Sequence, residues 1–126
     1  MSKKPITIDG APKAIGPYSQ GIVTGNLLFT SGQLPIDPAT GKIPDVSIEE
    51  HAHQVFKNLA AIAKAAGTSL DKVVKTTVFL SDINNFQAVN QVYAQYFNEP
   101  FPARSAFQVA ALPLGADVEV EAVIEL

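Results

Sequence analysis

The chain has 126 residues, of which 47% are hydrophobic, carries a formal net charge of −3 and contains no cysteine. This is the size of a single domain with one hydrophobic core, here residues 1–126, and the lack of cysteine excludes disulfides, thiolate metal sites and a cysteine nucleophile. No apolar run approaches the roughly 18 residues of a membrane span, and the scattered lysines with a single arginine, Arg104, argue against nucleic acid as a partner, so we expect a soluble, cytoplasmic protein.

The first part of the chain predicts a β-hairpin. Apolar runs at Tyr18–Thr24 and Leu27–Leu34 flank Gly25-Asn26. Both of these residues tolerate the positive φ that a tight two-residue turn requires. We also expect a short extra strand at Ile6–Ile8, ahead of the hairpin.

A helix is expected next. Ser47-Ile48-Glu49-Glu50 fits a capping box, in which serine and glutamate satisfy free backbone N–H groups at a helix start. Gly67 is suited to the position just after a helix end. Between them the apolar residues repeat with helical spacing, at Ile48, Ala52, Val55, Phe56, Leu59, Ile62, Ala63 and Ala66.

The second half of the chain predicts a strand, a helix and two further strands. Val73–Leu80 is rich in valine and threonine, which is typical of strands. Asp82 is a candidate cap for the second helix. Two strands are expected after that helix, at Ala103–Val109 and Asp117–Leu126. The apolar stripe of the second helix is Phe86, Val89, Tyr93, Tyr96 and Phe97.

This order of elements favours a two-layer α+β sandwich, because two helices cannot cover both faces of such a sheet and should lie together on one. Val73–Leu80 nevertheless places apolar residues on both of its faces, counting Val74, Thr76, Val78 and Leu80 as one face. A strand that is apolar on both faces is buried on both. We therefore expect a second copy of the chain to cover the open face, which makes the protein a homo-oligomer.

Arg104 is the most informative polar residue. It lies in a short apolar strand directly before Ser105, and a guanidinium that is partly buried needs an anionic partner because it cannot lose its charge. One interpretation is two-pronged binding of a substrate carboxylate. The alternatives are an internal salt bridge to Glu119 or Glu121, or a solvated position at a sheet edge.

Alternation in the last strand separates two carboxylates from the core. Val118, Val120, Ala122 and Ile124 form one face, and Glu119 and Glu121 share the other. Two carboxylates on one face can orient a water or act as acid and base. A wet outer surface of the sheet explains the same pattern.

Two hydroxyl groups and two histidines complete the set of candidates. Tyr18 and Ser31 lie beside glycines, where a backbone N–H can approach a ligand closely, although turn formation explains the same residues. His51 and His53 are two residues apart on the first helix and point to different sides, so they make a poor metal pair. We expect both to be solvated.

Several motifs make the sequence similar to the RidA (YjgF-type) family of reactive-intermediate deaminases. The resemblance runs through almost the whole chain, and the motifs occur in the order of the family. They are Ala14-Ile15-Gly16-Pro17-Tyr18-Ser19-Gln20-Gly21, Thr30-Ser31-Gly32-Gln33-Leu34-Pro35, Val74-Lys75-Thr76-Thr77-Val78-Phe79-Leu80, Val89-Asn90-Gln91-Val92-Tyr93, Phe101-Pro102-Ala103-Arg104-Ser105 and Val118-Glu119-Val120-Glu121-Ala122.

The resemblance implies a mixed sheet with the chorismate mutase-like fold, assembled as a homotrimer with sites between subunits. It implies hydrolysis of 2-aminoacrylate and related enamines or imines, such as 2-iminobutanoate and 2-iminopropanoate, to 2-keto acids and ammonia, without cofactor or metal. By position, Arg104 resembles the carboxylate anchor and Glu119 the residue that orients the attacking water. Tyr18 and Ser31 resemble residues that line the cleft, while Gly32 and Ala106 would offer backbone contacts. Many relatives carry cysteine at the position of Ala106, and a backbone contact survives that difference.

A second function fits the same residues. The cleft could bind a keto or amino acid and signal to a partner enzyme without turnover, because both functions need Arg104. Glu119 separates the two, since an enzyme needs its carboxylate and a sensor does not. An RNA-cleaving function, proposed for relatives, fits the acidic net charge of −3 least well.

Overall fold

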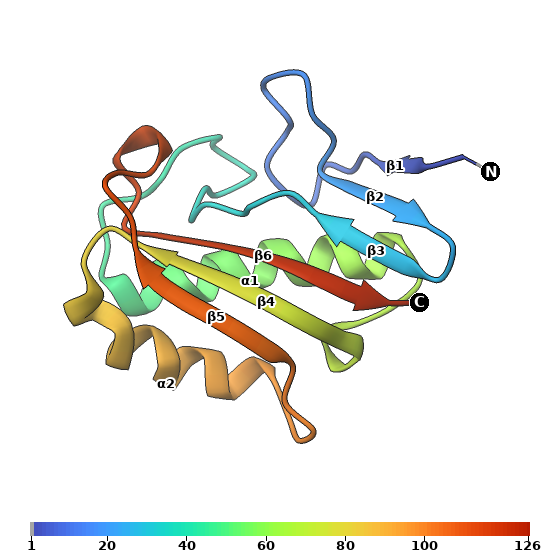
Figure 1. The fold of residues 1–126 in the computed structure, drawn as a ribbon. Coiled ribbons are helices and arrows are strands. Elements are labelled where there is room, and N and C mark those ends of the chain that lie inside the picture. The colour runs from blue at the N-terminus through green and yellow to red at the C-terminus, as the bar shows by residue number, and fades with distance from the viewer. Residues whose placement is uncertain (1) are drawn as a thin grey trace.

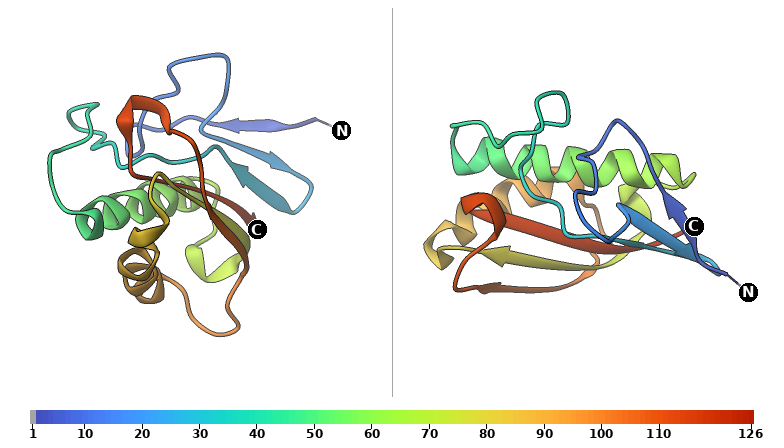
Figure 2. Two further views of the ribbon diagram at one scale, coloured as in Figure 1. Left: turned by 60° about the vertical axis from the view of Figure 1, so that its left-hand side comes forward. Right: turned by 90° about the horizontal axis from the view of Figure 1, so that it is seen from above.

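The computed structural model describes residues 2–126, which form one six-stranded sheet with two helices. The strands are β1 (Lys4–Ile6), β2 (Gly21–Thr24), β3 (Leu27–Thr30), β4 (Val73–Leu80), β5 (Ala103–Gln108) and β6 (Val118–Glu125), and the helices are α1 (Ile48–Ala65) and α2 (Phe86–Tyr96). The strand order is β1-β2-β3-β6-β4-β5, and every pair is antiparallel except β4 and β5. Both helices pack on one face, so the predicted two-layer α+β fold is confirmed (Figures 1 and 2).

The boundaries of α1 follow from its caps. The Ser47 hydroxyl accepts a hydrogen bond of 3.1 Å from the Glu50 N–H, which satisfies one of the free donors of the first turn. At the other end Gly67 has a φ of 82°, in the left-handed region that favours glycine. The N–H groups of Gly67 and Thr68 then reach back to the carbonyls of Lys64 and Ala63. These paired bonds form a Schellman motif, which ends the helix where the sequence predicted.

The last strand of the chain lies at the centre of the sheet. β6 pairs with β3 on one side and with β4 on the other. Its residues alternate as predicted: Val118, Val120 and Ile124 are fully buried, and Ala122 is nearly so. This buried face packs against α1, so the register of β6 fixes Glu119 and Glu121 on the face that the helices do not cover.

Two local predictions were wrong in detail. The register of β4 shifts between Val73 and Lys75, and this bulge turns Val74 outward, with 45% of its surface exposed, instead of onto the buried face. Asp82 does not cap α2. Its carboxylate accepts from the N–H of Asn84 and caps a short 3₁₀ turn, Ile83–Asn85, from which α2 continues.

The face of the sheet opposite the helices carries large apolar side chains. Phe29 and Phe107 are 43% and 40% exposed, and the rings of Phe79 and Phe107 lie 5.3 Å apart between their centroids. Lys75 and Ser105 lie among them, joined by a hydrogen bond of 3.0 Å. Within residues 2–126, no helix is long and apolar enough to cross a membrane.

His51 is buried rather than solvated, so the expectation for this residue was wrong. Its Nδ1 lies 2.9 Å from both carboxylate oxygens of Asp117, and its Nε2 lies 2.7 Å from the carbonyl oxygen of Pro44. Both ring nitrogens thus face acceptors, and only the doubly protonated ring can donate to both. Burial opposes that charge, but the Pro44 carbonyl and Asp117 outweigh it and raise the pKa of His51 above its ordinary value.

Protonated His51 should therefore stabilise the fold at acidic pH more than at alkaline pH. Because its pKa is raised on folding, its contribution is complete below the unfolded pKa of about 6.5 and is lost as the pH rises through the folded pKa. Urea unfolding of wild type and His51→Gln from about pH 6 to pH 9 should show the difference in stability between them shrinking as the pH rises. The matched control is His53→Gln, because His53 contacts the Tyr96 hydroxyl and no carboxylate. A difference that is independent of pH would contradict the charged state of His51.

Candidate active site

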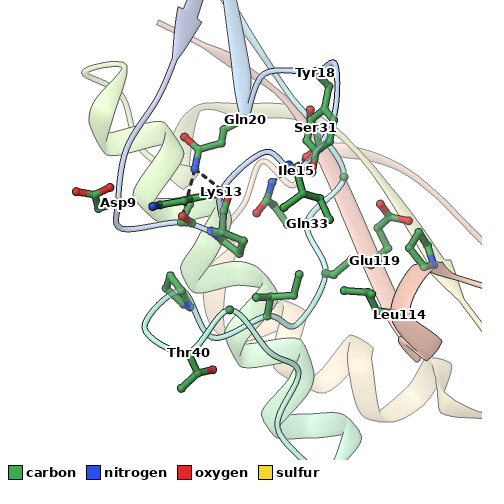
Figure 3. A pocket seen from close by; sticks show the side chains of 18 of the residues that line it. Asp9, Lys13, Ile15, Tyr18, Gln20, Ser31, Gln33, Thr40, Leu114 and Glu119 are labelled. Atoms are coloured by element: carbon green, nitrogen blue, oxygen red, sulfur yellow. Dashed lines mark hydrogen bonds between the residues drawn. The ribbon is translucent and has the colours of Figure 1, made fainter.

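A pocket of about 1020 Å³ lies where the loops before β2, after β3 and before β6 meet (Figure 3). Four of the six predicted site residues are at this end of the sheet: Tyr18, Ser31, Gly32 and Glu119. They come from three separate segments, so the fold and not the local sequence brings them together. The remaining two, Arg104 and Ala106, do not line the pocket.

A break in the pairing of β3 with β6 builds the centre of the pocket. Phe29 pairs with Val123, and the next paired residue, Gln33, lies opposite Val120. Four steps along one strand thus match three along the other, so one extra residue bulges out between them. Bulges of this kind re-aim side chains and are frequent beside active sites. Here the bulge contains Ser31 and Gly32 and places Gly32 against Glu119.

The Glu119 carboxylate occupies the space that a side chain at residue 32 would fill. A Cβ built on Gly32 would overlap the carboxylate of Glu119. The absence of that Cβ lets the carboxylate lie directly against the backbone of residue 32. The sequence prediction assigned only a backbone contact to Gly32, so this steric role is an addition.

Glu119 is a stronger base than an exposed glutamate. Burial raises the pKa of Glu119 above its ordinary value, and the negative charge of Glu121 raises it further. Apolar side chains surround the mouth of the pocket, since Ile15 and Leu114 line it while remaining 81% and 63% exposed. Leu114 holds a φ of 59°, a backbone conformation that is uncommon outside glycine and often found at functional sites.

The two hydroxyl groups have defined internal partners. Ser31 donates its hydroxyl proton to the carbonyl oxygen of Ser19, and its N–H donates to the carbonyl oxygen of Gln20. Its oxygen lone pairs therefore remain available as acceptors for a ligand N–H. Tyr18 is half exposed, and its hydroxyl accepts a long bond of 3.4 Å from the Ile15 N–H. Both side chains line the pocket (Figure 3).

Arg104 lies on the helix side of the edge strand β5. It pairs in register with Thr76 on β4, and its guanidinium carbon is 4.7 Å from the centroid of the Tyr93 ring and 5.2 Å from that of Phe86. Its Nη1 donates a bond of 2.6 Å to Oδ1 of Asn90. Neither internal salt bridge considered from the sequence, to Glu119 or to Glu121, is formed, and within residues 2–126 the salt bridge found joins His51 to Asp117 instead.

Sequence reasoning missed the residues that surround Arg104. Asn90 lies one turn after Phe86 and three residues before Tyr93, so all three share one side of α2. The available signal was a polar side chain within the apolar stripe of a helix. Ala106, two residues beyond Arg104, is half-buried, pairs with Val78 and packs against the core.

Arg104 and Glu119 are far apart in one chain. Arg104 is level with Thr76 and thus with Ala122, three residues along β6 from Glu119 and two strands away. Strand spacing and rise place their Cα atoms about 14 Å apart. The two side chains also point to opposite faces of the sheet. One chain therefore carries two separate parts of the predicted site.

Substitution of Gly32 by alanine should displace the Glu119 carboxylate toward solvent. The pKa of Glu119 should then fall back toward its ordinary value, because the burial that raises it is reduced. An NMR titration of the glutamate side chains measures this change. Gly10→Ala is the control, since a Cβ there meets its nearest neighbour, Ala61 Cβ, at an ordinary 3.7 Å. An unchanged Glu119 titration in Gly32→Ala would show that the contact is not tight.

Comparison with known proteins gives the family. The family described as "Endoribonuclease L-PSP" matches residues 8–126. A RutC family protein of Sinorhizobium fredii is 57% identical over 98% of both chains, and the human 2-iminobutanoate/2-iminopropanoate deaminase is 49% identical over 98% of this chain and 90% of its own. The structure of Escherichia coli TdcF with bound serine superposes with a TM-score of 0.92 at 41% identity, covering 98% of each chain. The chain therefore belongs to the endoribonuclease L-PSP family, which is the RidA (YjgF-type) family that its motifs predicted.

Proposed function

We propose that the protein hydrolyses the imine and enamine forms of small 2-amino acids, such as 2-iminobutanoate and 2-aminoacrylate, to 2-keto acids and ammonia. The observation that carries this proposal is the state of Arg104, an exposed guanidinium that is held in place by a neutral amide and two rings. Such a cation is suited to a planar carboxylate, which it can bind through two parallel hydrogen bonds. The similarity to the human deaminase and to TdcF, whose structure contains serine, supports a ligand of this class.

We infer that a second copy of the chain completes each site. Arg104 and Glu119 project from opposite faces of the sheet, with about 14 Å between their Cα atoms, so one four-carbon acid cannot contact both side chains of one chain. The exposed rings of Phe29 and Phe107 on the open face also favour burial against another copy. A cyclic homotrimer, as the resemblance implies, would place Arg104 of one copy near the pocket of the next.

The chemistry needed is modest. The protonated imine is already electrophilic at C2, so Arg104 would fix the carboxylate while Glu119 takes a proton from water as that water attacks C2. Glu119 then returns this proton to the nitrogen of the resulting carbinolamine. The C–N bond breaks, ammonia leaves, and Glu119 takes the hydroxyl proton as the C2 oxygen becomes the keto group. The raised pKa of Glu119 makes its carboxylate a better base for the first step. Ser31 could accept a hydrogen bond from the substrate nitrogen.

Replacing each carboxylate of β6 by an amide should distinguish the role of Glu119 from that of Glu121. Glu119→Gln keeps shape and hydrogen bonding but cannot take the proton, so kcat should fall about 10²-fold or more while binding of 2-oxobutanoate changes little. Glu121→Gln, the matched control on the same face of β6, should retain most of the activity. Stopped-flow decay of the imine, generated by a threonine dehydratase, gives the rates, and calorimetry gives the binding. Equal activity in both variants would mean that Glu119 is not the base, and a wild-type protein that binds 2-oxobutanoate without accelerating imine decay would favour the non-catalytic ligand-binding function.

Mixing two inactive variants tests whether sites lie between copies. Arg104→Ala and Glu119→Gln each lack one part of the site, so each alone should be inactive. If the chains are refolded together in equal amounts, about a quarter of the sites in any cyclic assembly combine both intact parts and should recover activity. Light scattering of wild type should give the mass of three chains. No recovery of activity on mixing would mean that both residues act within one chain, contrary to the proposal.

A further inference from the structure

Arg104 is oriented without being neutralised. The Asn90 amide oxygen accepts from Nη1 at 2.6 Å, and the guanidinium lies over the rings of Tyr93 and Phe86. Within residues 2–126, no Asp or Glu oxygen lies within 4.0 Å of the guanidinium nitrogens. The contacts that hold Arg104 are therefore a neutral acceptor and two ring faces, which leave its full positive charge available.

The support beneath Arg104 is anchored in the core. The Tyr93 hydroxyl is hydrogen bonded to the Thr76 hydroxyl at 2.8 Å, and both residues are buried. This bond joins α2 to β4 directly below the guanidinium. Because Asn90 is on the same side of α2 as Tyr93, the Tyr93–Thr76 bond fixes the part of the helix that carries Asn90. The short Asn90 side chain thus offers its amide oxygen to Arg104 from a fixed backbone position.

A guanidinium offers two edges to a carboxylate, one formed by Nη1 and Nη2 and the other by Nε and Nη2. Asn90 accepts from Nη1, which belongs to the first edge, and this bond involves neither nitrogen of the second edge. We propose that Asn90 is a positioning residue that presents the Nε–Nη2 edge of Arg104 to the substrate carboxylate, and that it must be an amide because a carboxylate would compete with the substrate. This inference rests on the proposed function, in which Arg104 binds that carboxylate.

Two substitutions of Asn90, by aspartate and by alanine, should weaken substrate binding in one order if the residue positions Arg104 and in the opposite order if its role is merely structural. Asn90→Asp preserves the shape of the side chain but pairs Arg104 with an internal anion, which lowers the attraction for a second carboxylate. Asn90→Ala removes the orienting bond and leaves the charge free. If Asn90 positions Arg104, the aspartate variant should bind substrate less well than the alanine variant. If Asn90 only stabilises the fold, the isosteric aspartate should be the milder change.

The test measures binding of 2-oxobutanoate by calorimetry and imine hydrolysis by stopped flow. For Asn90→Asp we expect Kd and KM to rise about tenfold or more, the scale of one charged hydrogen bond, with kcat changed much less. Asn90→Ala should raise both by a smaller factor. Gln95→Glu makes the same amide-to-acid change at an exposed position five residues further along α2. Among residues 2–126 the Gln95 side chain bonds to the Gln91 carbonyl alone, so this variant should behave as wild type. Melting temperatures of all variants identify any loss of folded protein.

The outcomes for Asn90 and for the proposed reaction can be told apart. A larger effect for alanine than for aspartate, an effect on kcat alone, or no change in either variant would overturn the role of Asn90. Wild-type protein that binds 2-oxobutanoate but hydrolyses no imine would refute the proposed reaction, and the order of the Kd values would still decide on Asn90. Wild-type protein that binds no keto acid would overturn both proposals.

Discussion

The pairing of β6 with both β3 and β4 is the constraint on which the rest of the structure depends. One face of this strand packs against α1 through every second residue from Val118 to Ile124, four in all. A slip by one residue would expose all four and bury Glu119 and Glu121 without partners, which is strongly unfavourable. The same packing that stabilises the core therefore fixes Glu119 beside the bulge that contains Gly32.

The separation of Arg104 and Glu119 within one chain has an electrostatic benefit. An arginine close to a glutamate lowers the pKa of that glutamate and loses its own attraction for other anions. Here Arg104 contacts a neutral amide, and the charge nearest to Glu119 that affects its pKa is Glu121, which raises it. Within one chain, Arg104 therefore stays a free cation and Glu119 a basic carboxylate.

Local sequence signals predicted the elements well because each depends on neighbours in the chain. Three short-range signals were confirmed by the structure: the cap at Ser47, the glycine at residue 67 and the alternation of β6. The failures needed tertiary information. The outward turn of Val74 depends on how β4 meets β6, and the burial of His51 depends on Asp117, 66 residues away.

For the candidate site too, the sequence predicted which residues take part but not how the fold places them. Motifs were sufficient to name Tyr18, Ser31, Gly32, Glu119 and Arg104, but they could not show that Arg104 lies on a different face from the others. That result follows from the register of β5, which pairs Arg104 with Thr76 on the face that the helices cover. Asn90 was missed for the same reason, since its importance depends on which strand α2 crosses.

The central position of the final strand also has a consequence for how the protein is made. A ribosome releases the β2–β3 hairpin and both helices before β6, so β3 and β4 cannot pair with β6 until residues 118–125 have been synthesised. Until then the apolar faces of the nascent sheet lack their central strand, and the pairings that close it join distant parts of the chain, which slows folding. We therefore expect the sheet to close only after β6 has left the ribosome, and the chain to be most exposed to aggregation or chaperone binding before that point.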